Sequence, residues 1–152
     1  MIIREARPAD GDAIRALVAA TLAEFGFPVE AGGADSDLDD VPLGYQRRGG
    51  LFRVIVDEDV IVGCGGLYPV ASRVVELRKM YFHPSIRGRG LGRRLLEDLI
   101  DEARRHDFTR IELETASSLT AAIGLYQSAG FIETKGPTHS NRGDRTFALD
   151  LR

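Results

Sequence analysis

The sequence lacks the residues and runs that mark several protein classes. Its 152 residues include one cysteine, Cys64, so no internal disulfide can form, and a cytoplasmic location is expected. No stretch of about 18 apolar residues occurs, so no membrane span is expected, and Met1 to Glu5 shows no apolar signal-peptide core. The three histidines and the cysteine are scattered without ligand spacing, so no metal site is expected.

A basic surplus, which nucleic-acid-binding proteins usually show, is also absent. The formal net charge is −3, and we therefore expect no nucleic-acid partner. A hydrophobic content of 43% and a charged content of 28% are ordinary for a soluble protein. The length suits one domain with one core, residues 1–152.

The order of the expected elements indicates a mixed fold. Apolar periodicity predicts strands at residues 2–6, 51–56, 60–68, 74–82, 110–115, 131–134 and 146–151. A first helix follows Pro8, with a buried stripe that ends at Phe25, and a short helix is expected after Ser36. Further helices are expected at about residues 90–106 and around Tyr126. A meander followed by a β-α-β order predicts an α/β sandwich with a mixed sheet.

A segment rich in glycine and arginine, Arg87-Gly88-Arg89-Gly90-Leu91-Gly92, lies between an expected strand and an amphipathic helix. Backbone N–H groups at a helix start, together with the helix dipole, favour an anion. Glycines let the main chain approach phosphate oxygens closely, and the arginines at 87, 89, 93 and 94 add positive charge. The segment predicts a pyrophosphate cradle, although a left-handed glycine turn with a solvated basic edge would have the same composition.

Two common phosphate-binding patterns do not fit this segment. No G-x-x-x-x-G-K-[ST] run occurs, and a G-x-G-x-x-G pattern starting at Gly88 would need glycine where Arg93 stands. The pattern that remains is Arg-x-x-Gly-x-Gly, formed by Arg87, Gly90 and Gly92. It resembles the acetyl-CoA signature of the GNAT superfamily of N-acetyltransferases.

A second segment, residues 122–131 with the sequence AIGLYQSAGF, resembles the GNAT pattern A-x-x-L-Y-x-x-x-G-F, in which the tyrosine reaches the CoA sulfur. Glu76 to Pro84 also looks like the GNAT strand that leads into the cradle. The resemblance covers about residues 74–131, and residues 77–81 with 113–115 are similar to GNAT domains fused to MarR-type regulators, here as a stand-alone domain. Many relatives have Asn where Leu119 stands, so an Asn contact to CoA is not expected.

The resemblance implies a single GNAT-like α/β domain. Its central sheet would be mixed and mostly antiparallel, of about six to seven strands, with helices on both faces. It implies an N-acetyltransferase that uses acetyl-CoA, without a metal, and that moves the acetyl group to a primary amine by direct attack in a ternary complex. The implied acetyl-CoA-binding residues are Met80, Tyr81, Phe82, Arg87, Gly88, Arg89, Gly90, Leu91, Gly92, Arg93 and Tyr126.

Two residues are the candidates for proton transfer. Tyr126 can protonate the departing thiolate, because a phenol has a pKa near 10, although its helical spacing also suits a core aromatic. Glu76 stands where many GNAT enzymes have an acidic base. It can equally pair with Arg78 or Lys79, or orient the amine. Glu114, on the neighbouring strand, could share either role.

One acidic segment of the sequence bears on the acceptor. The acids from Asp35 to Asp40 could attract a cationic amine, but such a run is more often solvated surface. A small-molecule amine is favoured. The alternatives are a protein or peptide amine, or a non-catalytic acyl-CoA sensor, and an RNA-binding domain ranks last because no aromatics interleave with the arginines. Many such folds form homodimers, and the sequence does not decide this.

Overall fold

The computed structural model describes residues 1–152. The strands are β1 (Ile2–Glu5), β2 (Leu51–Asp57), β3 (Val60–Ala71), β4 (Val74–Phe82), β5 (Arg110–Thr115), β6 (Ile132–Thr134) and β7 (Arg145–Asp150). The α-helices are α1 (Gly11–Glu24), α2 (Leu43–Arg47), α3 (Leu91–Arg105) and α4 (Thr120–Ser128). Short 3₁₀ turns occur at η1 (Pro8–Asp10), η2 (Ser36–Asp40) and η3 (Pro84–Ile86).

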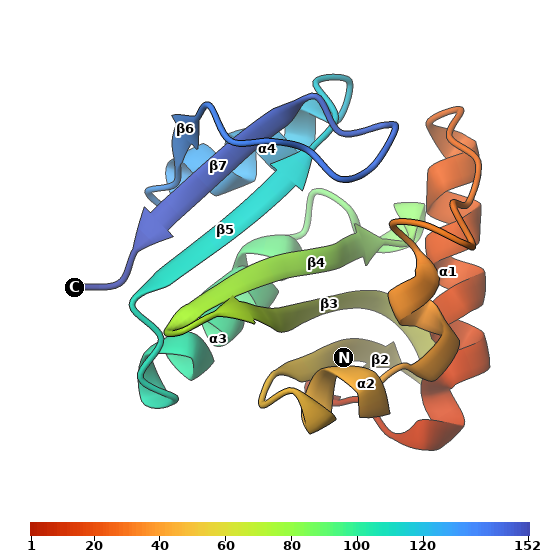
Figure 1. The fold of residues 1–152 in the computed structure, drawn as a ribbon. Coiled ribbons are helices and arrows are strands. Elements are labelled where there is room, and N and C mark those ends of the chain that lie inside the picture. The colour runs from red at the N-terminus through yellow and green to blue at the C-terminus, as the bar shows by residue number, and fades with distance from the viewer.

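All the strands belong to one sheet, in the order β1-β2-β3-β4-β5-β7-β6. Only β4 and β5 run parallel, and every other neighbouring pair is antiparallel. The parallel pairing extends from Val74↔Arg110 to Glu76↔Glu112 and then stops. Beyond it, the two strands diverge toward their carboxyl ends (Figure 1). The mixed, mostly antiparallel sheet of the sequence analysis is confirmed, and its parallel pair opens into a wedge.

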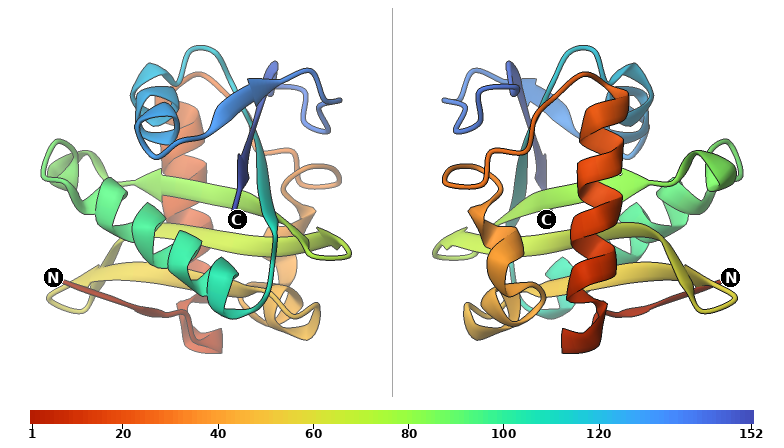
Figure 2. Two further views of the ribbon diagram at one scale, coloured as in Figure 1. Left: turned by 90° about the vertical axis from the view of Figure 1, so that its left-hand side faces the viewer. Right: turned by 90° about the vertical axis from the view of Figure 1, so that its right-hand side faces the viewer.

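Helices cover both faces of the sheet, as expected. The helix α3 buries a stripe that includes Leu95, Leu99 and Ala103, and its polar stripe faces solvent. Together with α4 it packs on one face and encloses the larger apolar cluster. The opposite face is covered by α1 and α2, whose buried residues include Ile14 and Tyr45 (Figure 2). Each helix thereby removes an apolar stripe from water, which is the main stabilising contribution.

The structure differs from the sequence prediction in two local features. The helix α2 was not predicted, because its five residues are too few to show a helical period. Phe25 was expected in the buried stripe of the first helix but is 40% exposed. It lies one residue beyond α1, at the C-cap, where the chain has left the helical period. No helix combines the length and apolarity that would be needed to cross a membrane.

Candidate active site

The glycine- and arginine-rich segment forms an open turn at the start of α3. Gly88 and Gly90 both have a φ of +76°, in the left-handed region that favours glycine. A Cβ added at either position would meet no atom within 4 Å, so the space beside them is open. The N–H groups of residues 88–93 make no hydrogen bond with the rest of the chain. Consecutive free N–H groups at a helix start fit a pyrophosphate.

Gly92 brings three elements close together at this point. A Cβ at Gly92 would lie 3.3 Å from the Leu125 side chain, in α4, and 3.5 Å from the ring of Phe82, at the end of β4. The distance to Leu125 is shorter than most Cβ contacts, whereas the distance to Phe82 is an ordinary van der Waals contact, so the glycine lets α3 begin close against α4 and beside β4. This contact holds the cradle beside the helix that carries Tyr126.

The arginines of the segment are not equivalent. The Arg87 guanidinium donates to the Phe82 carbonyl at 2.7 Å and to Glu24 at 2.8 Å, so it joins the cradle to the end of α1. Arg93 donates to Ser128 Oγ at 2.9 Å. Arg89 is exposed and makes no ion pair, so its charge remains available at the rim. Unpaired positive charge is therefore supplied by Arg89 and by Arg94, which is also exposed and makes no ion pair, whereas Arg87 connects the cradle to α1.

The wedge between β4 and β5 exposes backbone groups of β4. His83 N–H donates to the Val62 carbonyl, and Tyr81 is registered against Cys64. Because antiparallel pairing alternates, the intervening Phe82 directs its N–H and C=O away from β3 and into the wedge. The Phe82 carbonyl is taken by Arg87, and its N–H stays open. An extended ligand can therefore hydrogen-bond to β4 as an added strand would.

A β-bulge shapes β4 where it faces the cleft. The register with β3 shifts between Cys64 and Gly66, so that Lys79 and Met80 oppose Gly65. Lys79 takes up the extra residue with a φ of +55°, which costs free energy for a residue other than glycine. Burial raises the pKa of the Cys64 thiol to about 12, so the thiol stays protonated and donates to the Lys79 carbonyl at 3.1 Å. The bulge directs consecutive side chains of β4 toward the α1 and α2 face.

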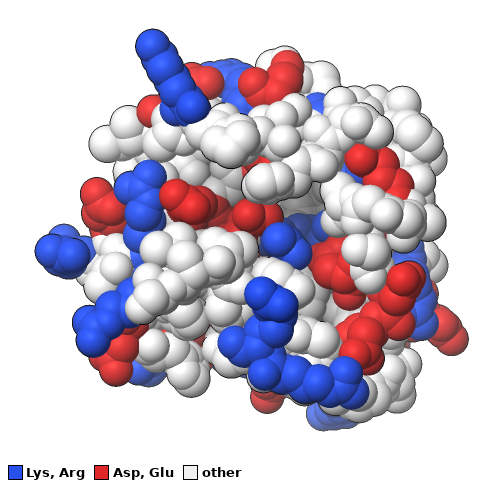
Figure 3. Space-filling view, viewed as in Figure 1, with Lys and Arg blue, Asp and Glu red and all other residues white.

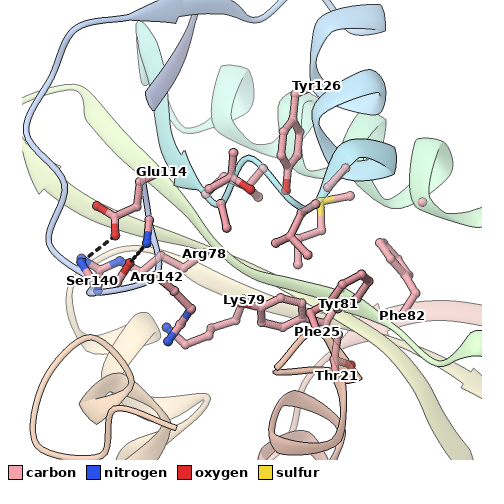
Figure 4. A pocket seen from close by; sticks show the side chains of 18 of the residues that line it. Thr21, Phe25, Arg78, Lys79, Tyr81, Phe82, Glu114, Tyr126, Ser140 and Arg142 are labelled. Carbon is pink, nitrogen blue, oxygen red and sulfur yellow. Dashed lines mark hydrogen bonds between the residues drawn. The ribbon is translucent and has the colours of Figure 1, made fainter. Parts of the chain in front are cut away.

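A cleft of about 820 Å³ follows the wedge and joins the cradle to the bulge. It is lined by residues 76–82 of β4, by the end of β5, by the cradle glycines and by α4. Figure 4 shows the Tyr126 side chain extending from α4 toward the side chains of β4. In the space-filling view the face is hollowed near its centre, and basic and acidic side chains meet around the hollow (Figure 3).

Tyr126 lines the cleft and is 7% exposed. Its ring packs on Phe131, with centroids 5.8 Å apart, and its hydroxyl makes no hydrogen bond within the chain. Burial, with a smaller effect of Tyr81, raises the pKa of Tyr126 well above its ordinary value near 10. The phenol therefore stays protonated at neutral pH and is available as a proton donor.

Glu76 and Glu114 have different surroundings. Glu76 Oε1 accepts from Arg78 Nε at 2.7 Å, so the pairing considered from the sequence is present. Glu76 Oε2 makes no hydrogen bond within the chain, and the side chain is 17% exposed in the cleft. Both oxygens of Glu114 instead accept backbone N–H groups, from His139 at 2.6 Å and Ser140 at 2.8 Å. Glu114 fixes the loop between β6 and β7, whereas Glu76 keeps an oxygen free.

A buried cluster of charges lies beside the part of the cleft that Asp37, Lys79 and Arg142 line. Lys79 Nζ lies 3.2 Å from Asp35 and 3.1 Å from Asp37, and the Asp35 side chain is fully buried. Arg142, from the loop between β6 and β7, makes a two-pronged contact with Asp35 at 2.7 and 2.9 Å. The same guanidinium reaches Glu30 at 3.0 Å. The cluster joins the bulge to loops that are far apart in the sequence.

The sequence analysis treated Asp35 and Asp37 as solvated surface more often than not, and that interpretation is wrong for both. Burial alone would raise the pKa of Asp35, but hydrogen bonds from Arg142 and the Glu30 N–H, with the charge of Lys79, bring the pKa below its ordinary value. Sequence reasoning did not single out Arg142, because its partners lie more than a hundred residues away. It also gave no sign that Lys79 is buried.

No group of three or more histidine, cysteine, aspartate or glutamate side chains is arranged to hold a metal ion. The charged residues at the cleft are instead paired with one another or with backbone groups. The structure thus brings Tyr126, Glu76, the cradle and residues 80–82 to one cleft, as the sequence analysis grouped them. Arg89 and Arg93 are not among the residues that line the cleft.

Replacing Asp35 tests how strongly the charge cluster stabilises the fold. Asp35→Asn should lower the free energy of unfolding by about 3–5 kcal/mol at neutral pH, because Lys79 and Arg142 lose their buried anionic partner. The folded pKa of Asp35 is lowered, so its stabilisation is present above pH 3.8 and is lost as the pH falls through the folded value. Urea unfolding should therefore show the difference from wild type shrinking in acid.

The matched control is Asp39→Asn, in the same turn but exposed. It should change the free energy of unfolding by no more than about 0.5 kcal/mol. Equal losses in the two variants would contradict the structural role given to the cluster.

Comparisons with known proteins agree with this geometry. The family model described as "Acetyltransferase (GNAT) family" matches residues 15–131. The N-acetyltransferase YjgM of Escherichia coli is 36% identical over 135 residues, which cover 86% of this chain and 81% of YjgM. Human N-acetyltransferase 8B is 32% identical over 105 residues, covering 65% of this chain and 46% of that protein.

Solved structures share the fold. An acetyltransferase of the GNAT family from Staphylococcus aureus Mu50 superposes with a TM-score of 0.92 at 23% identity, covering 99% of both chains. The structure of yncA from Salmonella typhimurium, a protein described as a putative acetyltransferase and determined with acetyl-CoA, has a TM-score of 0.76 at 28% identity, covering 100% of this chain and 94% of the other. The chain belongs to the GNAT family of acetyl-CoA-using N-acetyltransferases.

Proposed function

We propose that this enzyme transfers the acetyl group of acetyl-CoA to the primary amine of a small molecule, with both substrates bound together. The observation that carries the proposal is the single cleft that joins the open N–H groups of residues 88–93 to the unpaired hydroxyl of Tyr126 and to Glu76. The proposal takes residues 1–152 as one acetyltransferase domain that acts in the cytoplasm, in keeping with the free thiol of Cys64.

The donor would lie along the cradle and the wedge. Gly88, Gly90 and the first turn of α3 offer N–H groups to the pyrophosphate, and Arg89 adds charge at the rim. The exposed edge of β4 at residues 80–82 would hold the extended arm, because its backbone groups have no partner strand there. Bound acetyl-CoA supplies an activated thioester, so the residues need only orient it, polarise it and move protons.

Three groups are placed for these tasks. The free oxygen of Glu76 would take the proton that the amine must lose before or during attack. The open N–H of Phe82 would stabilise the negative charge that develops on the thioester oxygen. Tyr126 would give its hydroxyl proton to the sulfur as the carbon–sulfur bond breaks, and burial keeps that proton in place at neutral pH. The acetyl group thus moves from sulfur to nitrogen: a carbon–nitrogen bond forms and the carbon–sulfur bond breaks. The attacking neutral amine loses one proton, and the sulfur gains one.

The end of the cleft that Arg142 lines, where the acceptor would bind, favours a small-molecule acceptor over a protein chain. Arg142 ties the loop between β6 and β7 to Glu30 and Asp35, in the loop between α1 and η2. The Asn141 N–H donates to Glu30 as well, at 3.0 Å. Figure 4 shows Arg142 and Lys79 beside each other under this end. Loops tied together in this way restrict the width that an acceptor can have.

Gly90→Asp tests the cradle. The substitution should weaken acetyl-CoA binding by at least about 100-fold, because a carboxylate facing a pyrophosphate costs several kcal/mol. Isothermal titration calorimetry with acetyl-CoA measures the effect.

Gly49→Asp is the matched control for Gly90→Asp. Gly49 also has a positive φ, of +87°, and open space around it, but lies after α2, away from the cradle. It should keep wild-type affinity, whereas equal weakening in both variants would place the phosphate elsewhere.

Tyr126→Phe tests the proposed proton donor. The ring and its contact with Phe131 are kept, so stability and the KM for acetyl-CoA should stay close to wild type. The kcat should fall by roughly 10²-fold if the hydroxyl supplies general-acid catalysis. A thiol-release assay checks this, and full activity in the variant would leave Tyr126 with a packing role only.

Glu76→Gln tests the proposed base. Because glutamine cannot accept the proton that the amine loses, kcat should fall by roughly 10²-fold in the variant, while the KM for acetyl-CoA stays close to wild type. Glu112→Gln is the control, because Glu112 is registered against Glu76 on β5 but is 44% exposed. A kcat for Glu76→Gln that matches wild type would reject the assignment.

A further inference from the structure

Arg78 is the one arginine of the cleft whose terminal nitrogens are free. Its Nε donates to Glu76 at 2.7 Å, and neither Nη makes a hydrogen bond within the chain. Arg87 and Arg142, the other arginines that line the cleft, use their terminal nitrogens on carboxylates. Arg78 therefore offers strong donors that the fold itself does not use.

The guanidinium of Arg78 is held in one orientation before any ligand binds. Its Cζ lies 3.9 Å from the centroid of the Tyr68 ring, within the range of a cation–π contact. Tyr68 is registered against Glu76 on the adjacent strand, so the ring and the carboxylate fix two sides of the same group. The side chain is 24% exposed. Because its freedom is already reduced, a ligand would lose less entropy on binding to it.

The neighbouring charged side chains do not occupy the two Nη groups of Arg78. Lys79, the next residue, is paired with Asp35 and Asp37 and is buried. Asp37 also accepts from the hydroxyl of Tyr45. Among the basic side chains at this end of the cleft, Arg78 is thus the one with open hydrogen-bonding capacity.

The shape of the open donors selects the ligand. With Nε occupied, the two Nη groups remain for an end-on, two-pronged contact, which matches a planar carboxylate. Glu76 is the other member of this ion pair. Its free Oε2 can accept a hydrogen bond from an amine. One ion pair therefore presents donors for a carboxylate and an acceptor for an amino group close together.

We propose that Arg78 binds the carboxylate of the acceptor, and that the acetylated amine belongs to an amino acid. This inference rests on the proposed function, because it assigns the acceptor of the same cleft. Arg78 is a specificity-determining residue in this view. It holds the acceptor so that its amine faces Glu76, and it takes no part in the proton transfers.

The test compares matched acceptors with and without a carboxylate. Phenylalanine, methionine and glutamate are each assayed beside their α-carboxamides, with thiol release from acetyl-CoA as the readout. Wild type should favour the carboxylate form in kcat/KM by about 10- to 100-fold for at least one pair, mostly through KM, as expected for hydrogen bonds to a charged group. Arg78→Gln should bring that ratio close to one, and Arg78→Lys should restore part of it.

The ratio of kcat/KM between the carboxylate acceptor and its carboxamide separates a specificity role of Arg78 from a merely structural one. A structural role would lower kcat/KM equally for both acceptors. The KM for acetyl-CoA should not change in Arg78→Gln. Arg48→Gln is the matched control: Arg48 also contacts the Tyr68 ring, with its Cζ 4.5 Å from the centroid, but it does not line the cleft. It should keep the wild-type preference.

A second measurement does not depend on turnover. Calorimetry with N-acetylphenylalanine, N-acetylmethionine and N-acetylglutamate, each beside its amide, reports carboxylate binding directly. Binding that Arg78→Gln abolishes, in a protein that acetylates no amine, would support the carboxylate contact of Arg78 alone and would contradict the proposed function and the amino-acid acceptor that rests on it. Turnover without a carboxylate preference, a preference that survives Arg78→Gln, or the absence of any carboxylate-dependent binding and turnover would overturn the inference.

Discussion

The early end of the pairing between β4 and β5 is the constraint on which the rest of the site depends. Backbone groups in a sheet interior need partners, and those of β4 beyond Glu76 lose theirs when β5 turns away. The Phe82 carbonyl finds one in Arg87, and the neighbouring N–H remains open to a ligand. The cradle at the start of α3 and the hydroxyl of Tyr126 lie along this same wedge. In the proposed function, binding and chemistry therefore share one structural origin.

The buried charges stabilise the opposite side of the wedge. Removing Lys79 and Asp35 from water is costly, and the cost is offset only because each has several close partners. The arrangement keeps a lysine in a left-handed conformation at the bulge and holds two distant loops over the acceptor end. It leaves Arg78 as the cation free to meet a substrate. If Arg78 binds the acceptor as proposed, the position of the loops, the geometry of the bulge and the choice of acceptor are connected through adjacent residues of β4.

Much of the fold could be predicted from local sequence patterns. The features that could not be predicted depend on contacts between residues far apart in the chain. The strands β4 and β5 were predicted with their observed bounds, although the alternation of β4 breaks at the bulge, where Lys79 and Met80 are both buried. The turn before α3 was predicted from its glycines, and positive φ values explain the presence of Gly88 and Gly90. By contrast, a left-handed Lys79 has no sequence signal. The pairing of Arg142 with Glu30 joins positions that only the folded sheet brings together.

The most direct test of the account is to follow the backbone amide signals of the protein by nuclear magnetic resonance during titration with acetyl-CoA. The account predicts the largest changes at residues 88–93, whose N–H groups have no partner in the chain, and at Phe82 in the wedge. Changes that leave these amides unaffected while others shift would contradict it, because acetyl-CoA would then bind away from the cradle.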